Sequence, residues 1–446
     1  MGQGVLNTAG WREGGEVADT AALMEDAGLT REAGDLRMAG VSLDAVARRA
    51  GTPAYVYNAE AIRRQFRRLD AALSSVPHRI CFAVKANSNL AVLRVLRDLD
   101  AGADIVSQGE LYRVLAAGFD PQRIVFSGVG KTREELVVAV AAGLGHVNLE
   151  SPAELDALAA VGQAAGREVR VGIRVNPDVT ADTHPFISTG GRGIKFGIPA
   201  DRVVEVARRI AATPGLRLTG LAMHLGSQLL DPEPYEKGLE RLISLVKAVR
   251  ESGIRTLETL DIGGGLGIRY AGAPGMDPER FAAAVAPAVA PLGLTLLLEP
   301  GRFLVGSAGV LLTEVLYRKH SGGKEFVVVD AGMNDLVRPS HYQAYHEILE
   351  LRSGGRPVQQ VDVVGPVCET GDFMALDRPL PGVVAGERLA ILGAGAYGFV
   401  MASSYNSRPR PPEVLVDQGR WALVRPREAI EALHAGESPD PRWERP

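Results

Sequence analysis

The sequence predicts an α/β protein, a (β/α)8 TIM-type barrel followed by a second, β-rich C-terminal domain. Eight apolar runs alternate with helical patterns over residues 59–312, which matches the roughly 250 residues of such a barrel. After residue 312, apolar runs follow at turn-punctuated spacing, which is typical of β structure. The chain has 446 residues, 46% of them hydrophobic, so it is long enough to bury more than one core.

The predicted barrel strands are short runs rich in branched and leucine side chains. They are residues 79–86, 102–107, 123–128, 146–150, 169–176, 217–224, 257–264 and 294–300. The predicted helices between them are residues 108–118, 132–142, 152–165, 199–213, 234–252 and 277–290. In this architecture the active site lies at the carboxyl ends of the strands.

The chain divides into four segments. Residues 1–36 show no sustained periodicity and are expected to form a loosely ordered extension. Residues 37–58 contain a short helix capped by Ser42 and a strand, and we expect them to pack with the β-rich domain. The barrel is expected at 59–312, and the β-rich domain, with one helix near residues 339–351, at 313–446.

Composition excludes several kinds of partner. The net charge is -4, so neither nucleic acid nor an anionic membrane surface is expected as a partner. Residues 281–298 carry no charge, but two prolines and a glycine break this run, so no membrane span is predicted. Only Cys81 and Cys368 occur, which suits a reducing compartment and makes a cytoplasmic location the expectation. The expected ligand is a small molecule, and no metal site is predicted.

Lys85 is the first candidate for chemistry because it directly follows the apolar strand that begins at Ile80. An ammonium at the mouth of a buried strand is poorly solvated, which favours the neutral amine and its attack on a carbonyl to form a Schiff base. The alternative is a lysine whose stem passes the strand end while its charge stays in water.

Polar residues end the other strands as well. They are Asp104, Ser107, Ser127, Glu150, Asn176, His224, Gly263, Gly264, Gly265 and Glu299. The three glycines after the seventh strand leave backbone N–H groups open to a phosphate, and Ser227 is placed to add a hydroxyl. The alternative is a tight turn without a ligand.

His224 and Glu299 fit an aromatic cofactor. His224 can lie flat against a ring, although a lone histidine is more often a core residue. A carboxylate at position 299 would pair with a pyridinium nitrogen and keep the ring electron-withdrawing, which fits pyridoxal 5'-phosphate. Its alternative role is a salt bridge to Arg302.

The β-rich domain carries two further candidate segments. Arg338 and Tyr342, at the start of a predicted helix, can point at one carboxylate. Cys368 and Glu369 share a glycine-bounded loop, where a thiol can donate a proton and a carboxylate can hold an ammonium. The alternatives are a small apolar residue and a surface acid.

The glycine spacing in LAILGAGAYG, residues 389–398, imitates a dinucleotide fingerprint. The prolines at positions 409, 411 and 412 leave no room for the crossover helix, so a Rossmann domain does not fit. Tyr397 is better interpreted as a contact to the ring or the phosphate.

The motifs FAVKANSN, HPFISTG, KFGI, HLGSQ, DIGGGLG, EPGR, MNDLVRPSHY, CETGD and GAYG occur in this order. Together with YNSRPRP they resemble the diaminopimelate decarboxylases, which are fold-type III pyridoxal-phosphate enzymes, over about residues 41–425. Several of these motifs are shared with ornithine and arginine decarboxylases.

The resemblance implies a role for each candidate. Lys85 would carry the cofactor, His224 would stack on its ring and Glu299 would pair with its nitrogen. The remaining cofactor contacts would be Asp104, Ser227, Gly263, Gly264, Gly265, Gly301, Arg302 and Tyr397. The substrate contacts would be Arg302, Arg338, Tyr342, Glu369 and Tyr397. Cys368, as proton donor, and Glu369 would come from the other subunit of a homodimer. The family usually has Ser where this chain has Thr370, so the contact of that hydroxyl stays open.

The implied activity is decarboxylation of meso-2,6-diaminopimelate at its D centre to give L-lysine and CO2. One alternative is a decarboxylase of the same fold for ornithine, arginine or a carrier-bound amino acid. Another is a regulator that binds the cofactor without catalysis, although such a chain should have lost Lys85 or Cys368.

Overall fold

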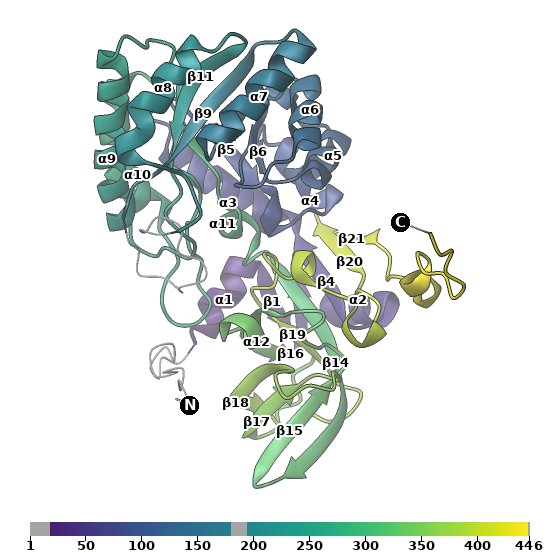
Figure 1. The fold of residues 1–446 in the computed structure, drawn as a ribbon. Helices are drawn as coiled ribbons and strands as arrows, with labels where there is room; N and C mark the ends of the chain where they lie inside the picture. The colour runs from purple at the N-terminus through teal and green to yellow at the C-terminus, as the bar shows by residue number, and fades with distance from the viewer. Residues whose placement is uncertain (1–17, 180–193, 445–446) are drawn as a thin grey trace, which may run out of the picture.

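The computed structural model describes residues 18–179 and 194–444. They form a barrel, in the upper half of Figure 1, and a second domain built on β-sheet, in the lower half. The HPFISTG motif, residues 184–190, lies outside the described residues.

Eight parallel strands close the barrel, as the sequence predicted. In the order of their pairing they are β5 (His78–Ala83), β6 (Gly102–Ile105), β7 (Ile124–Phe126), β8 (His146–Leu149), β9 (Val169–Asn176), β11 (Leu216–Ala222), β12 (Thr259–Asp261) and β13 (Thr295–Leu298). β13 pairs with β5, and this pairing completes the circle. A two-residue strand, β10 (Ile198–Pro199), adds to β9 outside the ring.

Helices follow the strands and cover the outside of the barrel (Figure 1). They are α3 (Ala59–Ala72), α4 (Leu90–Arg97), α5 (Gln108–Ala117), α6 (Arg133–Ala142), α7 (Pro152–Ala165), α8 (Val203–Ala212), α9 (Glu233–Glu251), α10 (Pro278–Val289) and the short α11 (Arg302–Val305). Their starts follow local chemistry, since Ser107, Thr132 and Ser151 each accept a hydrogen bond from a backbone N–H of the first turn.

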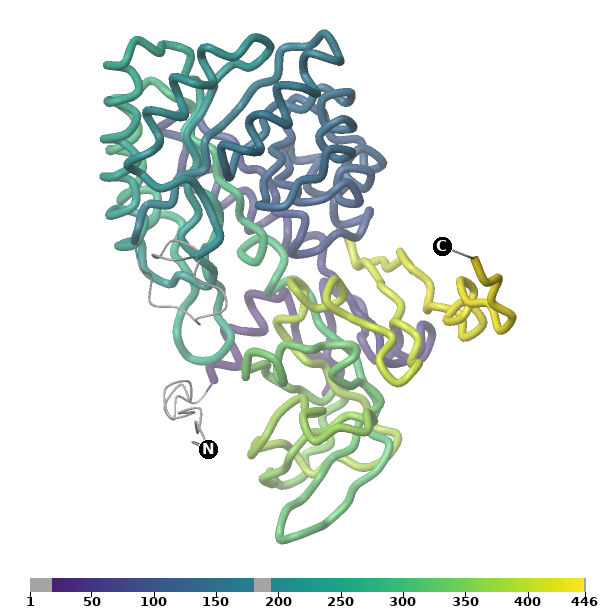
Figure 2. Tube along the Cα trace, viewed as in Figure 1, coloured from purple at the N-terminus to yellow at the C-terminus, as the bar shows by residue number. Residues whose placement is uncertain are grey.

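The second domain is a mixed sheet in the order β18-β17-β15-β14-β4-β20-β21, with β19 on β14 and β16 on β19. Its strands are β4 (Ala54–Asn58), β14 (Gly309–Ser321), β15 (Lys324–Val329), β16 (Ile348–Glu350), β17 (Val358–Val364), β18 (Phe373–Pro381), β19 (Arg388–Ile391), β20 (Glu413–Asp417) and β21 (Arg420–Arg425). β4 precedes the barrel in the chain, yet it pairs with β14 and β20 behind it. Figure 2 shows the same path as a purple segment that lies among green and yellow ones.

Two expectations about local structure are wrong. The loosely ordered extension was expected through residue 36, but α1 (Thr20–Ala27), β1 (Leu29–Glu32) and β2 (Asp35–Met38) are regular, and β3 (Val41–Ser42) continues their sheet. Their apolar side chains are buried in one cluster with residues of β4 and β14, so tertiary packing supplies the order that periodicity did not show. Residues 1–17 lie outside the described residues.

The helix expected near 339–351 is also shorter than predicted. α12 spans only Arg338–Tyr342, because Gln343 adopts a left-handed φ of 53° that ends the helix. The following residues enter β16, which pairs with β19. Within the described parts of the chain, no helix is long and apolar enough to cross a membrane.

Candidate active site

Lys85 lies in a single 3-10 turn, Val84–Ala86, directly after β5. Its Nζ donates a hydrogen bond of 2.6 Å to Oδ2 of Asp104, which lies on the neighbouring strand β6 and is fully buried. Burial lowers the pKa of Lys85, but the charge of Asp104, with those of Tyr397 and Glu299, raises it above its ordinary value. The expectation of a neutral amine is therefore wrong for the free side chain, since Asp104 holds it as an ammonium.

Glu299 follows β13 and is buried in the barrel mouth. Oγ of Ser127 donates to its Oε1 across 3.5 Å. Burial raises the pKa of Glu299 well above its usual range, and the charges of Asp104 and Asp261 raise it further. Asp261, at the end of β12, is also buried, and burial raises its pKa to about 6. The barrel mouth thus brings together buried carboxyl groups whose negative charges disfavour one another.

The glycine turn, Gly263–Gly265, lies against both Glu299 and His224. Gly263 and Gly265 have φ of 72° and 108°, which L side chains rarely adopt, and a Cβ at Gly264 would lie 2.1 Å from the Glu299 carbonyl oxygen. The Gly264 N–H donates to His224 Nδ1 across 3.1 Å, which places the ring hydrogen on Nε2. Burial, with the charge of Arg174, lowers the pKa of His224 well below 6.5, so its ring is neutral.

Two buried arginines, Arg302 and Arg338, contact Tyr270. Arg302 Nη1 donates to the Tyr270 hydroxyl at 2.6 Å, and its Nη2 donates to Ser227 Oγ at 3.2 Å. The Arg338 guanidinium stacks 4.6 Å from the Tyr270 ring, and its Nη1 donates to His346 Nε2 at 3.0 Å. His346 Nδ1 in turn donates to the Leu392 carbonyl at 2.7 Å, which fixes its tautomer. Both guanidiniums are therefore held in place from several sides.

Tyr397 brings the second domain against the Lys85 turn, and Gly301 of the barrel lies against the same turn. The backbone N–H of Tyr397 donates to the Ala86 carbonyl at 2.9 Å, and the Arg302 guanidinium lies 4.9 Å from its ring. Tyr397 has a positive φ of 55°, so its orientation depends on these contacts. A Cβ at Gly301 would lie 2.8 Å from the Cβ of Ala86, so no larger residue fits there without a shift.

Cys368 and Glu369 belong to an exposed loop of the second domain. The Cys368 N–H donates to Asn406 Oδ1 at 3.1 Å, and the Tyr405 hydroxyl donates to Glu369 Oε2 at 2.8 Å. Both of these hydrogen bonds are made within the second domain. Tyr342 packs edge to face on His341 at 4.5 Å beside Arg338 on α12.

The described residues fit pyridoxal phosphate. The site offers an amine to the aldehyde, a buried carboxyl to a ring nitrogen, and a glycine turn beside Ser227 and Arg302 to a phosphate. Asp104 Oδ1, Asp261 Oδ2 and Arg302 Nε are buried without a hydrogen-bond partner among the described residues. Such atoms are expected where a polar ligand completes a site.

Three residues of this site were not predicted from the sequence: Asp261, Tyr270 and His346. Asp261 precedes the glycines in LDIGGGLG, so its place at a strand end was a signal that could have been used. Tyr270 and His346 are 76 residues apart and meet edge to face at 5.5 Å only in the folded chain.

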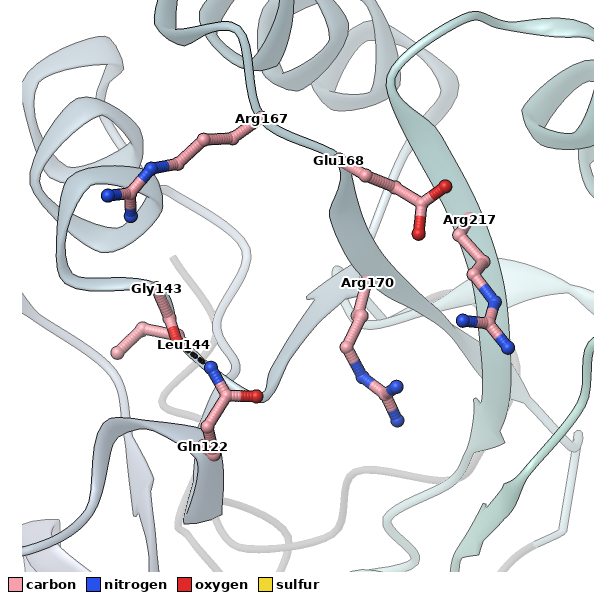
Figure 3. A pocket seen from close by; sticks show the side chains of 7 residues that line it. All are labelled: Gln122, Gly143, Leu144, Arg167, Glu168, Arg170 and Arg217. Atoms are coloured by element: carbon pink, nitrogen blue, oxygen red, sulfur yellow. Dashed lines mark hydrogen bonds between the residues drawn. The ribbon is translucent and has the colours of Figure 1, made fainter.

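A second depression lies at the opposite, amino-terminal end of the barrel and has a volume of about 310 Å³ (Figure 3). Its lining includes Arg167, Arg170 and Arg217. Arg170 and Arg217 pair with the two carboxylate oxygens of Glu258 at 2.5 and 2.6 Å, and Arg167 donates to the Ala141 carbonyl at 2.9 Å. These cations are engaged in holding strands and helix ends together, so this depression is not the catalytic site.

Comparisons with known proteins agree with this geometry. Residues 59–306 match the family model described as pyridoxal-dependent decarboxylase, pyridoxal binding domain. The chain is 49% identical over 399 residues to the diaminopimelate decarboxylase of Pseudomonas aeruginosa, covering 90% of this chain and 96% of that protein.

Solved structures give the same result. The diaminopimelate decarboxylase of Helicobacter pylori complexed with L-lysine matches at 39% identity with a TM-score of 0.85, covering 88% of this chain and 98% of that chain. The enzyme of M. jannaschii in complex with L-lysine matches at 33% identity with a TM-score of 0.88, covering 92% and 97%. From its barrel, its pyridoxal-binding domain and its near full-length similarity, the chain belongs to the diaminopimelate decarboxylases, within the pyridoxal-dependent decarboxylase family.

Proposed function

We propose that this protein converts meso-2,6-diaminopimelate to L-lysine and CO2 with pyridoxal 5'-phosphate as cofactor. The observation that carries the choice of substrate is Arg338, a buried guanidinium oriented by His346 and Tyr270 beside Arg302. A second carboxylate, which diaminopimelate has and ornithine lacks, is the group that such a buried, preoriented cation binds best.

The barrel, residues 59–312, holds the cofactor at Lys85 in this proposal. When bound, the cofactor supplies an electron-withdrawing ring that accepts the electrons left by departing CO2. Asp104 orients the lysine, while Glu299 would pair with the ring nitrogen and neutral His224 would lie against the ring. Ser227, the glycine turn, Gly301 and Tyr397 would hold the phosphate.

The second domain, residues 313–446, binds the other end of the substrate. Arg338 and Tyr342, with Arg302 of the barrel, hold the distal carboxylate, while Tyr397 closes the site next to the Lys85 turn. Glu369 holds the distal ammonium. The Cys368 thiol donates a proton to the carbon from which the carboxylate has left, and the bond between that carbon and CO2 is the bond that breaks.

Cys368 and Glu369 act across a homodimer in this proposal. Both lie in an exposed loop, and their contacts within the chain are to Asn406 and Tyr405. An exposed thiol with an assigned proton-transfer role needs a second surface to enclose it, and a head-to-tail copy of the chain provides one. The presence of only two cysteines, both free, supports a cytosolic location.

Lysine release from meso-diaminopimelate, measured with and without added pyridoxal phosphate, tests the proposal. Ornithine and arginine are offered in parallel. Arg338→Met should lower kcat/KM for diaminopimelate by about tenfold to a hundredfold, because a charge-assisted hydrogen bond contributes roughly 1.5–3 kcal/mol. Arg318→Met, which removes a partly exposed arginine paired with Glu325 in the same domain, is the control. Turnover of ornithine but not of diaminopimelate would reject the proposed substrate.

A cofactor-binding protein without catalysis is the second candidate. Borohydride reduction followed by peptide mapping would then find the cofactor on Lys85 while no lysine is released. The presence of both Lys85 and Cys368 favours the enzyme.

A further inference from the structure

Asp372 is a buried acid of the second domain that has no role so far in the proposed reaction. It is 4% exposed and directly precedes β18. Its Oδ1 accepts a hydrogen bond from the Met333 N–H at 2.6 Å, and its Oδ2 accepts one from the Val367 N–H at 2.6 Å. One carboxylate therefore holds two stretches of chain that are 34 residues apart in the sequence.

Each stretch carries a group that the proposed function assigns to the substrate. The first is the Arg338 segment, residues 330–342, which follows β15 and includes α12. The second is the Cys368 loop, residues 365–371, which lies between β17 and β18. Asp372 thus connects the cation proposed for the distal carboxylate to the thiol proposed as proton donor.

A closed turn holds the Met333 end of the Arg338 segment. The Gly332 N–H donates to Asp335 Oδ2 at 2.9 Å. The Gly332 carbonyl accepts the N–H groups of Asp335 and Leu336 at 2.8 and 3.0 Å. α12 begins two residues after Leu336. A displacement of Met333 should therefore carry Arg338 with it, because three hydrogen bonds fix the turn between them.

The backbone of Asp372 closes the Cys368 loop. Its N–H donates to the Glu369 carbonyl at 3.0 Å, and its carbonyl accepts the Gly365 N–H at 3.1 Å. The Glu369 N–H donates to the Val367 carbonyl at 2.8 Å, so hydrogen bonds bracket Cys368 on both sides. With the bond from Val367 to Oδ2, Asp372 makes three of the contacts that shape this loop.

Two glycines provide the space in which the carboxylate reaches both N–H groups. A Cβ at Gly365 would lie 2.5 Å from Asp372 Oδ2 and 2.7 Å from the Gly332 Cα. A Cβ at Gly332 would lie 3.2 Å from Asp372 Oδ1. A larger residue at either position would push the two backbones apart. The Arg338 segment and the Cys368 loop therefore pack backbone against backbone around Asp372.

We propose that Asp372 is a positioning residue that holds the Arg338 segment and the Cys368 loop in place through its two oxygens. In the proposed homodimer, Arg338 serves the active site of its own chain, while Cys368 serves that of the partner. One carboxylate then positions a group in each of two active sites. The inference rests on the proposed function, because the substrate roles of Arg338 and Cys368 come from it.

Asp372→Ala removes both acceptors and leaves two backbone N–H groups unpaired at a buried position. We expect kcat/KM for meso-diaminopimelate to fall about fivefold to a hundredfold, through both a lower kcat and a higher KM. Asp372→Asn, which keeps one acceptor, should lie between Asp372→Ala and the wild type. Borohydride should still trap the cofactor on Lys85, which the barrel holds.

Asp362→Ala is the matched control. Asp362 is also 4% exposed and lies on β17, where its Oδ1 accepts the Asp377 N–H at 2.7 Å. This variant loses a buried carboxylate of the same domain and should keep kcat and KM within twofold of the wild type. Wild-type values of both constants in folded Asp372→Ala would overturn the inference.

Mixed dimers separate the two halves of the inference. When a Cys368→Ala chain pairs with a Lys85→Ala chain, the complete site takes Arg338 from the first chain and Cys368 from the second. Asp372→Ala should raise KM when it is placed on the first chain and lower kcat when it is placed on the second. A residue needed for folding alone would lower the amount of active dimer equally from either chain, and that result would contradict the inference.

Two further results keep failures distinct. If Arg338→Met and Cys368→Ala leave turnover unchanged while Asp372→Ala lowers it, the proposed function is wrong about those groups, and the positioning role falls with it. If Asp372→Ala does not fold, hydrogen exchange of the wild type in increasing urea decides. The Arg338 segment and the Cys368 loop should then open in one step with one free energy, and separate opening would refute their connection through Asp372.

Discussion

The two ends of the barrel both carry charged side chains, but they use them differently. At the amino-terminal end, Glu258 pairs with Arg170 and Arg217, and all three side chains are between 33% and 40% exposed. At the carboxyl end, Asp104, Asp261 and Glu299 are buried, and Lys85 is the cation among them. At the first end each of these three groups has a partner of opposite sign and is accessible to water. At the second end the carboxyl groups outnumber the cation among them and are buried.

This difference distinguishes ion pairs that hold the fold together from groups reserved for chemistry. An exposed ion pair contributes little to stability and can be replaced at low cost. Buried carboxyl groups in excess of their cations raise one another's pKa, and they persist only where another molecule completes them. The following predictions test this contrast, from the largest expected effect to the smallest.

The largest effect is expected from Lys85→Ala at the carboxyl end. Turnover should fall by on the order of 10³-fold or more, because the cofactor loses the amine proposed to hold it. Lysine release measures it, and size-exclusion chromatography checks that the chain still assembles. Lys237→Ala, which removes an exposed lysine paired with Glu233, should leave turnover unchanged. Retained activity in Lys85→Ala would remove the lysine from its assigned role.

His146 sharpens the contrast because it is a buried titratable group near the amino-terminal end of the barrel. Burial and the charge of Arg170 lower its pKa from 6.5 to about 4. The folded state therefore binds fewer protons than the unfolded state between these values, and stability is lost as the pH falls from about 6.5 to 4. The contribution is about 3 kcal/mol at most.

Urea unfolding at several pH values checks this linkage. His146→Gln should remove about one proton from the pH dependence of the unfolding free energy over that range. His434→Gln, at an exposed histidine near the C-terminus, should leave it as in the wild type. An unchanged slope in His146→Gln would show that the buried imidazole is not the group that titrates.

Cys368→Ala tests whether the active site at the carboxyl end of the barrel is formed by one chain or shared between two. We expect kcat to fall about a hundredfold, as is usual when a proton donor is lost, while borohydride still traps the cofactor on Lys85. A change of less than twofold would mean that another group supplies the proton. Mixing Cys368→Ala with Lys85→Ala should restore part of the activity if the site is shared between two subunits.

The smallest effect is expected from Glu258→Gln at the amino-terminal end. The unfolding free energy should fall by about 0–1 kcal/mol, since both arginines stay accessible to water. Lysine release should stay within twofold of the wild type. A large loss of activity would show that this end also takes part in the reaction and would remove the contrast between the two ends.

Most of the barrel could be predicted because each strand is a short apolar run and most of the helices begin at a capping side chain. Lys85, Asp104 and Glu299 were predictable for the same reason, since strand ends meet at one face of a barrel. The order of residues 20–38 was not predictable, because it depends on packing against β14, more than 250 residues away in the chain.

The substrate end of the site was only half predictable. Arg338 could be chosen from the sequence, but His346 and Tyr270, which orient it, have no local signature. The charge state of Lys85 was predicted in the wrong direction, because burial alone was considered and its ion pair with Asp104 depends on the tertiary structure. The positions of Cys368 and Glu369 relative to a second subunit stay a prediction.

The pairing of β4 with both β14 and β20 has a consequence for biosynthesis. The whole barrel is an insertion between strands of one sheet, so β4 leaves the ribosome about 250 residues before its first partner and about 355 before its second. The barrel can close while translation continues, but the second domain stays incomplete until its last strands, β20 and β21, have been made. Removing the final 40 residues should therefore damage a sheet that begins near the other terminus, and the nascent chain must keep one β-strand available until then.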